Sequence, residues 1–387
     1  MAAPTICVSN RTLENLLEKL GESSPLVENA IESLCKSRFN AIFFLKIRAC
    51  NGYTGFGVPF SRVFCDTETL CEEFYPFASI FSRGIEMLYN CLKKSNYIYS
   101  LDDVSKILLV RLLSFLTETD SMKFIEELER KSCGPLYDKP QFTVAIAEHV
   151  FSKLTLTRSY TVDKTCTLQD FVSGTCKCGC NTDIKHKFED TSAGCSAVWH
   201  GSLDAIVGHA GDRVPLLISG NREFDEEYKY LTVDKHLNYH TIKHQLVAQA
   251  VVFSFLKQKN YPDSKISLVP VIGVSAKEVI FFLYDCKEDV LLQSVKMSLR
   301  CGKAVRYQTV IAIWLVLNYN YLGSGLGNIR NVHKCNFSSR ARDVLEVYRS
   351  ELVLGGVKES YEEDTLYPDD IPKEKICWPN KKPKFDF

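Results

Sequence analysis

The chain has 387 residues, of which 45% are hydrophobic and 24% charged; this is typical of a globular protein, and the length indicates two domains. The 47 basic and 47 acidic side chains cancel, and this balance argues against strong nonspecific binding to nucleic acid, which needs an excess of Lys and Arg. The 16 cysteines are too sparse for a disulfide scaffold.

The N-terminal residues have no basic start, apolar core or small-residue cleavage site, so we expect no signal peptide. The longest apolar run, residues 310–317, is about half of the roughly 20 residues that cross a bilayer, so we expect no transmembrane segment and no membrane partner. These features predict an intracellular protein, cytoplasmic or nuclear, with mostly reduced cysteines.

The first third of the chain, residues 1–134, is predicted to be an all-α domain. Leucines recur there at helical spacing at Leu13, Leu16, Leu17 and Leu20. Similar patterns occupy residues 26–35, 69–94, 101–116 and 121–131. Gly134 and Pro135 then indicate a domain boundary. No catalytic motif precedes this boundary, so the helical domain is a candidate surface for protein partners.

A second domain is predicted over residues 141–350, followed by a polar tail at residues 351–387. It opens with an amphipathic helix, residues 141–154, that carries Glu148 in mid-course. The tail is charged and contains prolines, so we expect it to be loosely ordered.

A cysteine cluster follows the first helix of this second domain. Thiolates at short spacing on a glycine-bearing turn can close a tetrahedral zinc site, and the candidate ligands are Cys176, Cys178, Cys180 and Cys195. The spacing differs from the usual pairs of cysteines two residues apart. The sequence therefore leaves two interpretations open, a structural Zn²⁺ site or a loop of reduced cysteines.

The stretch from residue 195 to residue 256 carries the strongest functional pattern. A predicted strand around Gly201 bears Asp204, and a second short strand covers residues 214–219. An acidic segment containing Glu227 and Lys229 comes next. A predicted helix then opens with Gln245 and also carries Gln249; its apolar residues recur at helical spacing.

This order of a strand with Gly-x-x-Asp, a strand, Glu-x-Lys and a Gln-bearing helix resembles the PD-(D/E)XK nuclease superfamily in its RecB-like form. The resemblance implies a metal-dependent nuclease acting on DNA or RNA. In that case Asp204 and Glu227 hold Mg²⁺ or Mn²⁺, which prefer oxygen ligands, and Lys229 orients the attacking water or offsets negative charge. Gln245 or Gln249 supports the site, and Glu148 is a candidate third acid, against the alternative of an ordinary solvent-facing glutamate.

Two alignments of this motif remain open. In the superfamily the Glu-x-Lys pair lies directly on the second strand, and aligned by strand those positions are Ser219 and Asn221. Aligned by motif, Glu227 and Lys229 supply both groups after an insertion. The first alignment predicts a catalytically inactive nuclease-like fold that binds nucleic acid or protein, and the second predicts an active enzyme.

The rest of the second domain is predicted to complete an α/β sandwich. Residues 265–274, 278–284 and 289–293 are rich in the Val, Ile and Phe that favour strands. Residues 305–321 are apolar on nearly every face, which is typical of a buried helix. The expected fold is a restriction-endonuclease-like central mixed sheet flanked by helices.

Overall fold

A computed structural model describes residues 8–70, 74–94, 96–132, 139–167, 188–220 and 237–357. Its centre is a large mixed sheet of 11 strands with the order β3-β1-β13-β12-β11-β10-β9-β5-β6, in which β14 also pairs with β12 and β4 with β1. The strands of this sheet are β1 (Ala41–Cys50), β3 (Cys65–Thr69), β4 (Tyr75–Pro76), β5 (Tyr160–Asp163), β6 (Phe188–Glu189), β9 (Ala205–Val207), β10 (Val214–Gly220), β11 (Leu268–Ser275), β12 (Glu278–Asp285), β13 (Val290–Ser294) and β14 (Met297–Ser298).

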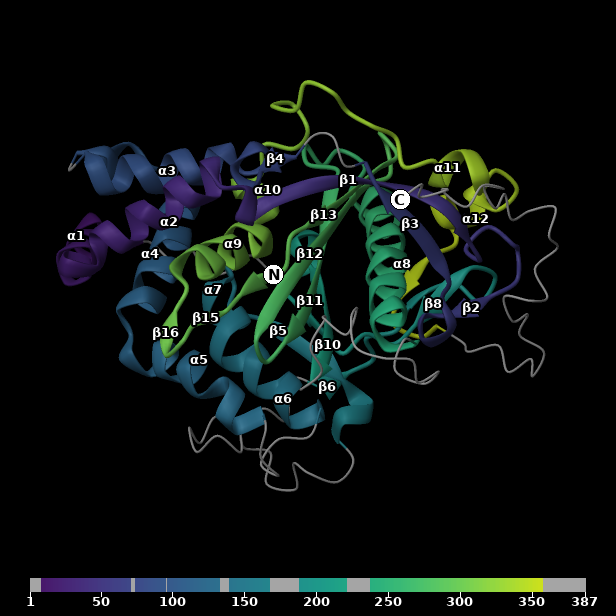
Figure 1. The fold of residues 1–387 in the computed structure, drawn as a ribbon, viewed down its shortest axis with the longest axis horizontal. Helices are drawn as coiled ribbons and strands as arrows, with labels where there is room; N and C mark the ends of the chain where they lie inside the picture. Colours follow the sequence, from purple (N-terminus) through teal and green to yellow (C-terminus); the bar gives the residue numbers. More distant parts are fainter. Residues whose placement is uncertain are drawn as a thin grey trace, which may run out of the picture.

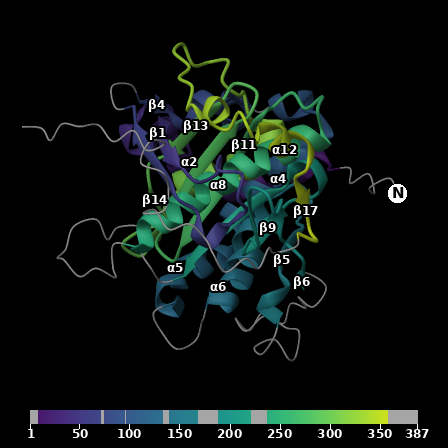
Figure 2. The same ribbon diagram turned by 90° about the vertical axis from the view of Figure 1, so that its right-hand side faces the viewer.

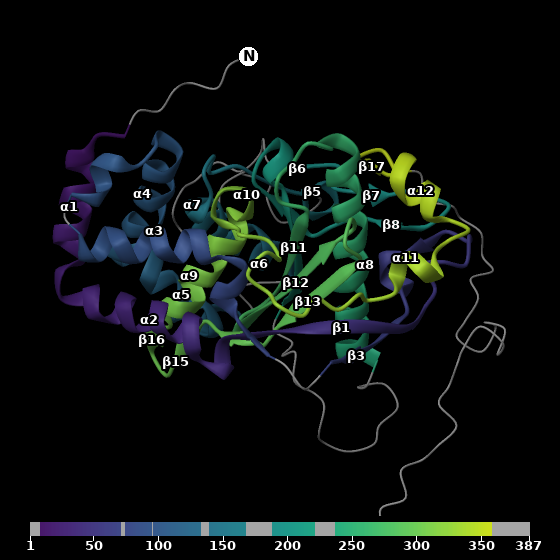
Figure 3. The ribbon, with the colours of Figure 1, turned by 90° about the horizontal axis from the view of Figure 1, so that it is seen from above.

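Helices cover both faces of the sheet (Figures 1 and 3). On one side lie α1 (Asn10–Leu20), α2 (Ser24–Lys36), α3 (Ser82–Lys93), α4 (Asp103–Thr117), α5 (Thr119–Ser132), α6 (Lys139–Ile146), α7 (Ser152–Leu154), α9 (Tyr307–Leu317) and α10 (Tyr319–Leu322). On the other lie α8 (Leu237–Asn260), α11 (Phe337–Arg340) and α12 (Leu345–Ser350), which Figure 2 turns toward the viewer. The molecule is therefore a mixed α/β protein with helix, sheet and helix layers.

The N-terminal region is helical at its start, but the prediction of an all-α domain is wrong. Residues 41–50 form β1, which lies between β3 and β13 in the central sheet, with Phe44 opposite Leu292. The reason is composition: a run of Ile, Phe and Leu fits a pleated, buried surface better than a helix. The helix predicted from residue 69 begins only at Ser82, because Tyr75–Pro76 pair with β1 as β4 and Phe77–Ile80 form a 3-10 turn.

Segments from both predicted domains share this one sheet and one apolar core. The buried helix α9 illustrates the connection, since the indole Nε1 of Trp314 donates a hydrogen bond to the carbonyl of Leu108 on α4 at 3.0 Å. The predicted boundary at Gly134 and Pro135 falls among residues 133–138, outside the described part of the chain, and stays a prediction.

Residues 139–275 carry a unit in which one helix, three antiparallel strands, a second helix and a further strand follow one another, with short strands inserted between the first two. Helix α6 continues through a π-helical turn (Ala147–Phe151) and α7, and β9 then pairs antiparallel with both β5 and β10, while β6, β7 (Ala193–Gly194) and β8 (Trp199–Gly201) lie between β5 and β9 in the chain. Helix α8 crosses over to β11, which runs parallel to β10 with Leu216 opposite Ile272. The predicted helices and the strands β10 to β13 of this region are confirmed, and α8 extends over Leu237–Asn260. The strand predicted around Gly201 is instead two short strands, β8 and β9, which belong to different sheets, and Asp204 lies in the bend just before β9.

A small sheet beside α8 has the order β17-β7-β8-β2. Its strands are β2 (Val58–Pro59), β7 (Ala193–Gly194), β8 (Trp199–Gly201) and β17 (Val353–Leu354), and a separate hairpin joins β15 (Arg300–Cys301) to β16 (Ala304–Val305). The ring of Trp199 stacks on Phe337 at 5.5 Å between centroids, which packs this sheet against α11. None of the described helices is both long and apolar enough to cross a membrane.

Candidate functional site

Asp204 immediately precedes β9, the strand that lies between β5 and β10 in the sheet. Its Oδ2 accepts a hydrogen bond from the backbone N–H of Ile218 on β10 at 2.6 Å. Its Oδ1 forms an ion pair with Nζ of Lys139, at the first residue of α6, at 2.7 Å. The Asp204 side chain is 19% exposed and that of Lys139 51%. The carboxylate is therefore fixed by the sheet on one side and reachable from solvent on the other.

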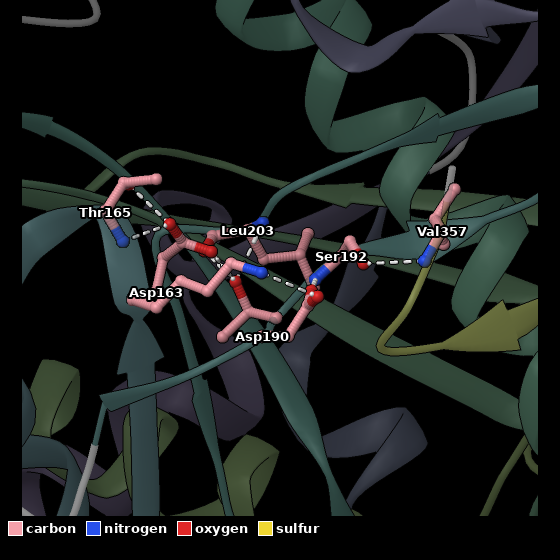
Figure 4. Close-up of polar contacts among 8 residues, drawn as sticks. Asp163, Thr165, Asp190, Ser192, Leu203 and Val357 are labelled. Atoms are coloured by element: carbon pink, nitrogen blue, oxygen red, sulfur yellow. Dashed lines mark hydrogen bonds and ion pairs between the residues drawn. The ribbon is translucent and has the colours of Figure 1, made fainter. Parts of the chain in front are cut away.

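A buried hydrogen-bond network fixes the loop that precedes Asp204 (Figure 4). Asp163, at the end of β5, accepts hydrogen bonds from the N–H of Thr165 at 2.9 Å and from the hydroxyl of Thr191 at 2.7 Å. The Thr191 hydroxyl also lies 2.6 Å from the carbonyl of Leu203 and accepts from the Leu203 N–H at 3.3 Å. The backbone N–H of Asp163 donates to the carbonyl of Asp204 at 3.2 Å, so Asp163 helps to position Asp204. Its carboxylate oxygens are already occupied by the donors from Thr165 and Thr191.

The same cluster reaches the end of the described chain. Asp190 accepts from the N–H of Ser192 at 2.9 Å and pairs with Lys164 at 3.0 Å. The hydrogen bonds from Ser192, together with the Lys164 ammonium, hold the pKa of Asp190 well below its usual range. Ser192 Oγ in turn accepts from the N–H of Val357 at 3.1 Å, as Figure 4 shows.

Glu148 is bonded to a residue at the end of β5 that lies away from Asp204. Its Oε2 accepts a hydrogen bond from the hydroxyl of Tyr160 at 2.6 Å. Tyr160 pairs with Val207, whereas the N–H of Asp163 donates to the carbonyl of Asp204 at the opposite end of β5. Three residues of extended strand separate the two ends by about 10 Å. Glu148 therefore has a partner of its own, on the π-helical turn between α6 and α7.

The two glutamines lie on α8, which packs on the sheet face opposite α6. Gln245 is half-buried, and Gln249 is buried at 1% exposure. Among the described residues, the Gln249 side-chain oxygen has no hydrogen-bond partner. Ser219, the residue on β10 that the strand alignment places at the acid position, donates its hydroxyl to the carbonyl of Val274 at 3.2 Å. The end of β10 therefore carries no carboxylate at that position.

Several predicted site residues lie outside the described residues, namely Glu227, Lys229, Asn221, Cys176, Cys178 and Cys180. The remaining candidate zinc ligand, Cys195, is half-buried, and its thiol lies 3.9 Å from a carboxylate oxygen of Glu351. Within the part of the chain that the structure covers, no three His, Cys, Asp or Glu side chains gather as a metal site would require. The zinc hypothesis accordingly stays a prediction.

Two neighbours of Asp204 in the structure, Lys139 and Asp163, could not be identified from the sequence. Lys139 follows directly on the Gly134 and Pro135 boundary, and no spacing rule connects it with a residue on β9. Asp163 is the final residue of β5 and pairs beside Asp204 only because β5 and β9 are antiparallel. The strand β5 itself was not predicted, so the register that would have indicated Asp163 was missing.

Comparison with known proteins gives no relative: no family model matches the chain, and neither curated proteins nor solved structures provide a match.

Proposed function

We propose that the chain adopts a PD-(D/E)XK-like fold and hydrolyses phosphodiester bonds of DNA or RNA with the help of a divalent metal ion. The observation that carries this proposal is the unit from α6 to β11. It has a helix, three strands (β5, β9 and β10) paired antiparallel to one another with β6 to β8 between β5 and β9 in the chain, a second helix, and β11 parallel to β10, and Asp204 immediately precedes β9. The strand that follows Asp204, the next strand and the Gln-bearing helix come in the order that the resemblance implies.

The ligand chemistry at Asp204 fits Mg²⁺ or Mn²⁺. A carboxylate oxygen is the ligand that such cations prefer, and this one is partly exposed and held rigidly by β10. In the proposal, Glu227 supplies the second carboxylate and Lys229 the ammonium, because both follow the end of β10 along the chain. A bound ion would lower the pKa of the attacking water and offset the charge that develops on the phosphate.

Lys139 is the described residue that competes with this ion. Its ammonium occupies Oδ1 of Asp204, so metal binding requires the lysine to withdraw or to be shared with a phosphate. A long side chain at 51% exposure can do so at small cost, since exposed ion pairs contribute about 1 kcal/mol or less. In the substrate complex the same ammonium is placed to contact the nucleic-acid backbone.

A second candidate function is a catalytically inactive nuclease-like fold that serves as a binding or regulatory module. Two observations favour it: Ser219 occupies the acid position of the strand alignment, and Lys139 already neutralises Asp204. Partners would then be nucleic acid or a protein, the latter through the helices of the N-terminal region. This module would bind its partner without any metal requirement.

The test is a cleavage assay on labelled single- and double-stranded DNA and RNA, with Mg²⁺, Mn²⁺ or EDTA. We compare wild type with Asp204→Ala and Lys229→Ala, and we use Glu32→Ala as the control, since Glu32 forms an ion pair with Lys36 at 2.8 Å outside the site. The nuclease proposal expects metal-dependent cleavage that both site variants lose and the control keeps. Absence of cleavage by folded wild type, or full activity in Asp204→Ala, refutes it.

A further inference from the structure

A cavity of about 630 Å³ lies between the end of α8, α10 and the turn before β10. Its volume is in the range of small-molecule sites. Its titratable lining groups are His209, Asp212, Lys257, Tyr261, Asp263 and Tyr321. None of these belongs to the Asp204 site.

Lys257 is the unusual member of this lining, because it is only 8% exposed. Its Nζ lies 3.0 Å from the hydroxyl of Tyr319 and also bonds to the side-chain oxygen of Asn320. Nζ sits 4.1 Å from the centroid of the Tyr319 ring as well. Among the described residues no carboxylate forms an ion pair with it. A buried amine without a counter-ion favours its neutral form.

The neighbours of Lys257 are held in fixed orientations. The Asn320 amide nitrogen donates to the carbonyl of Gly211 at 2.9 Å and to the carboxylate of Asp212, which turns the amide oxygen toward Lys257. Asp212 is thus bonded to Asn320, and its negative charge acts on Lys257 electrostatically. Burial raises the pKa of Tyr319 well above its usual value, so Tyr319 stays a neutral phenol. Both direct polar contacts of Nζ are thus uncharged.

Burial lowers the pKa of Lys257 to about 7, while the charge of Asp212 acts in the opposite direction. At neutral pH a large fraction of this side chain is then a free amine, whereas an ordinary lysine is protonated almost completely. A neutral amine in a cavity is the state in which lysine reacts with a carbonyl group.

We propose that this cavity is a binding site for a small uncharged aldehyde or ketone, which Lys257 holds as an imine. The amine lone pair attacks the carbonyl carbon to form a C–N bond, and one amine proton moves to the carbonyl oxygen, which gives a carbinolamine. Loss of that hydroxyl group together with the second amine proton, as water, gives the C=N bond; hydrolysis reverses the step. No oxidant or reductant is consumed.

The lining favours an uncharged ligand over an anion. Asp212 and Asp263 both face the cavity, so a phosphate or carboxylate group would meet two like charges. The rings of Tyr261 and Tyr321 supply flat apolar surface for an aromatic or aliphatic substituent. This site is independent of the proposed nuclease function.

The experiment is reductive trapping of the whole chain with benzaldehyde and cyanoborohydride at pH 7, followed by peptide mass mapping. Two internal controls are Lys259, on the same helix with Nζ 2.9 Å from the carbonyl of Leu352, and Lys287, whose Nζ lies 3.4 Å from the carbonyl of Pro262 beside the cavity. We expect one benzyl group on Lys257, and we expect the labelling rate to saturate as the benzaldehyde concentration rises. Because the fraction of neutral amine sets this rate, Lys257 should be labelled at least about tenfold faster than either control lysine.

A second variant separates reactivity from a structural role. In Asp212→Asn the hydrogen bond from Asn320 is retained, but the negative charge that favours the protonated form of Lys257 is removed. Trapping at pH 6 should therefore become faster than in wild type. Labelling of Lys257 no faster than that of Lys259 and Lys287, or no response to Asp212→Asn in protein shown to be folded, overturns the proposal and leaves Lys257 as a tie between α8 and α10.

Discussion

Nζ of Lys139 lies 2.7 Å from Oδ1 of Asp204, and this contact joins the first residue of α6 to the start of β9. On the opposite side of the carboxylate, Oδ2 accepts from the N–H of Ile218 at 2.6 Å. Asp204 therefore has a structural role in the sheet in addition to its proposed role at a metal. The two roles are separable, because each uses a different oxygen.

The structural role predicts that Asp204→Ala lowers the free energy of unfolding by about 1–3 kcal/mol, because the N–H of Ile218 loses its acceptor. Asp204→Asn keeps a side-chain oxygen and should lose less. Urea unfolding followed by circular dichroism measures both. Equal stability of the alanine variant and wild type would show that the Ile218 contact contributes nothing.

Removing Lys139 should help a cation to bind. In Lys139→Ala the Asp204 carboxylate loses its competing ammonium, so its affinity for Mn²⁺ should rise by up to about fivefold, the equivalent of an exposed ion pair. Calorimetric titration with Mn²⁺ measures this change. Lys36→Ala removes a comparable ion pair with Glu32 and should leave the affinity as it is. Weaker Mn²⁺ binding in Lys139→Ala would contradict the competition.

The hydroxyl of Thr191 should be essential to the loop before Asp204. Thr191→Val leaves Leu203 N–H without an acceptor and removes one donor from Asp163, which predicts a loss of about 1–3 kcal/mol in the free energy of unfolding. Thr191→Ser retains the hydroxyl and should stay close to wild type. Thr157→Val, at a hydrogen bond on the exposed surface, is the control. A valine variant within 0.5 kcal/mol of wild type, roughly the range of surface substitutions, would refute this role.

The buried Lys257 should make stability depend on pH. Its pKa is lowered to about 7 in the folded chain, and the unfolded value is near 10.5, so between these values the unfolded chain binds more protons. The contribution of Lys257 to the free energy of unfolding is therefore lowest below pH 7. It rises by about 2 kcal/mol between pH 7 and pH 9. Lys257→Met should abolish this rise and Lys259→Met should keep it, as measured by urea unfolding at the two pH values.

The unfolding measurements stop at pH 9, because ionisation of tyrosine changes stability at higher pH. The pKa of Tyr321 is raised to about 12 by burial, while tyrosines of the unfolded chain ionise near 10, so stability falls again at higher pH. Identical pH slopes in wild type and Lys257→Met would mean that Lys257 titrates as an ordinary exposed lysine.

Gly194 should tolerate no side chain. Its φ is 112°, and a Cβ there would lie 2.2 Å from the carbonyl oxygen of Trp199 on the neighbouring strand. Gly302 also has a positive φ, of 61°, but a Cβ there would meet no atom within 4 Å. We expect Gly302→Ala to lower stability by about 1 kcal/mol through backbone strain alone, and Gly194→Ala to lose about 3 kcal/mol or more. Thermal unfolding of the two variants tests the difference, and equal losses would contradict it.

The sequence by itself determined the elements whose signal is local. The apolar surface of α9, the β-branched runs of β11 to β13 and the short strand β10 were predictable, because periodicity and side-chain shape act over a few neighbouring residues. Asp204 was selected from the same local order of elements, and its role as a site residue stays a prediction. The same local reasoning failed at β1, because residues 41–50 were assigned to an all-α domain and form a strand of the central sheet.

The tertiary structure decided which groups meet. Asp204 pairs with Lys139, Asp163 lies beside it, and Glu148 bonds to Tyr160 instead, because the antiparallel register of β5 and β9 sets which ends are adjacent. Lys257 is one lysine among many in the sequence, and only its burial against Tyr319 and Asn320 changes its proton affinity. Desolvation and pairing depend on long-range contacts, so no pattern of neighbouring residues could have indicated them.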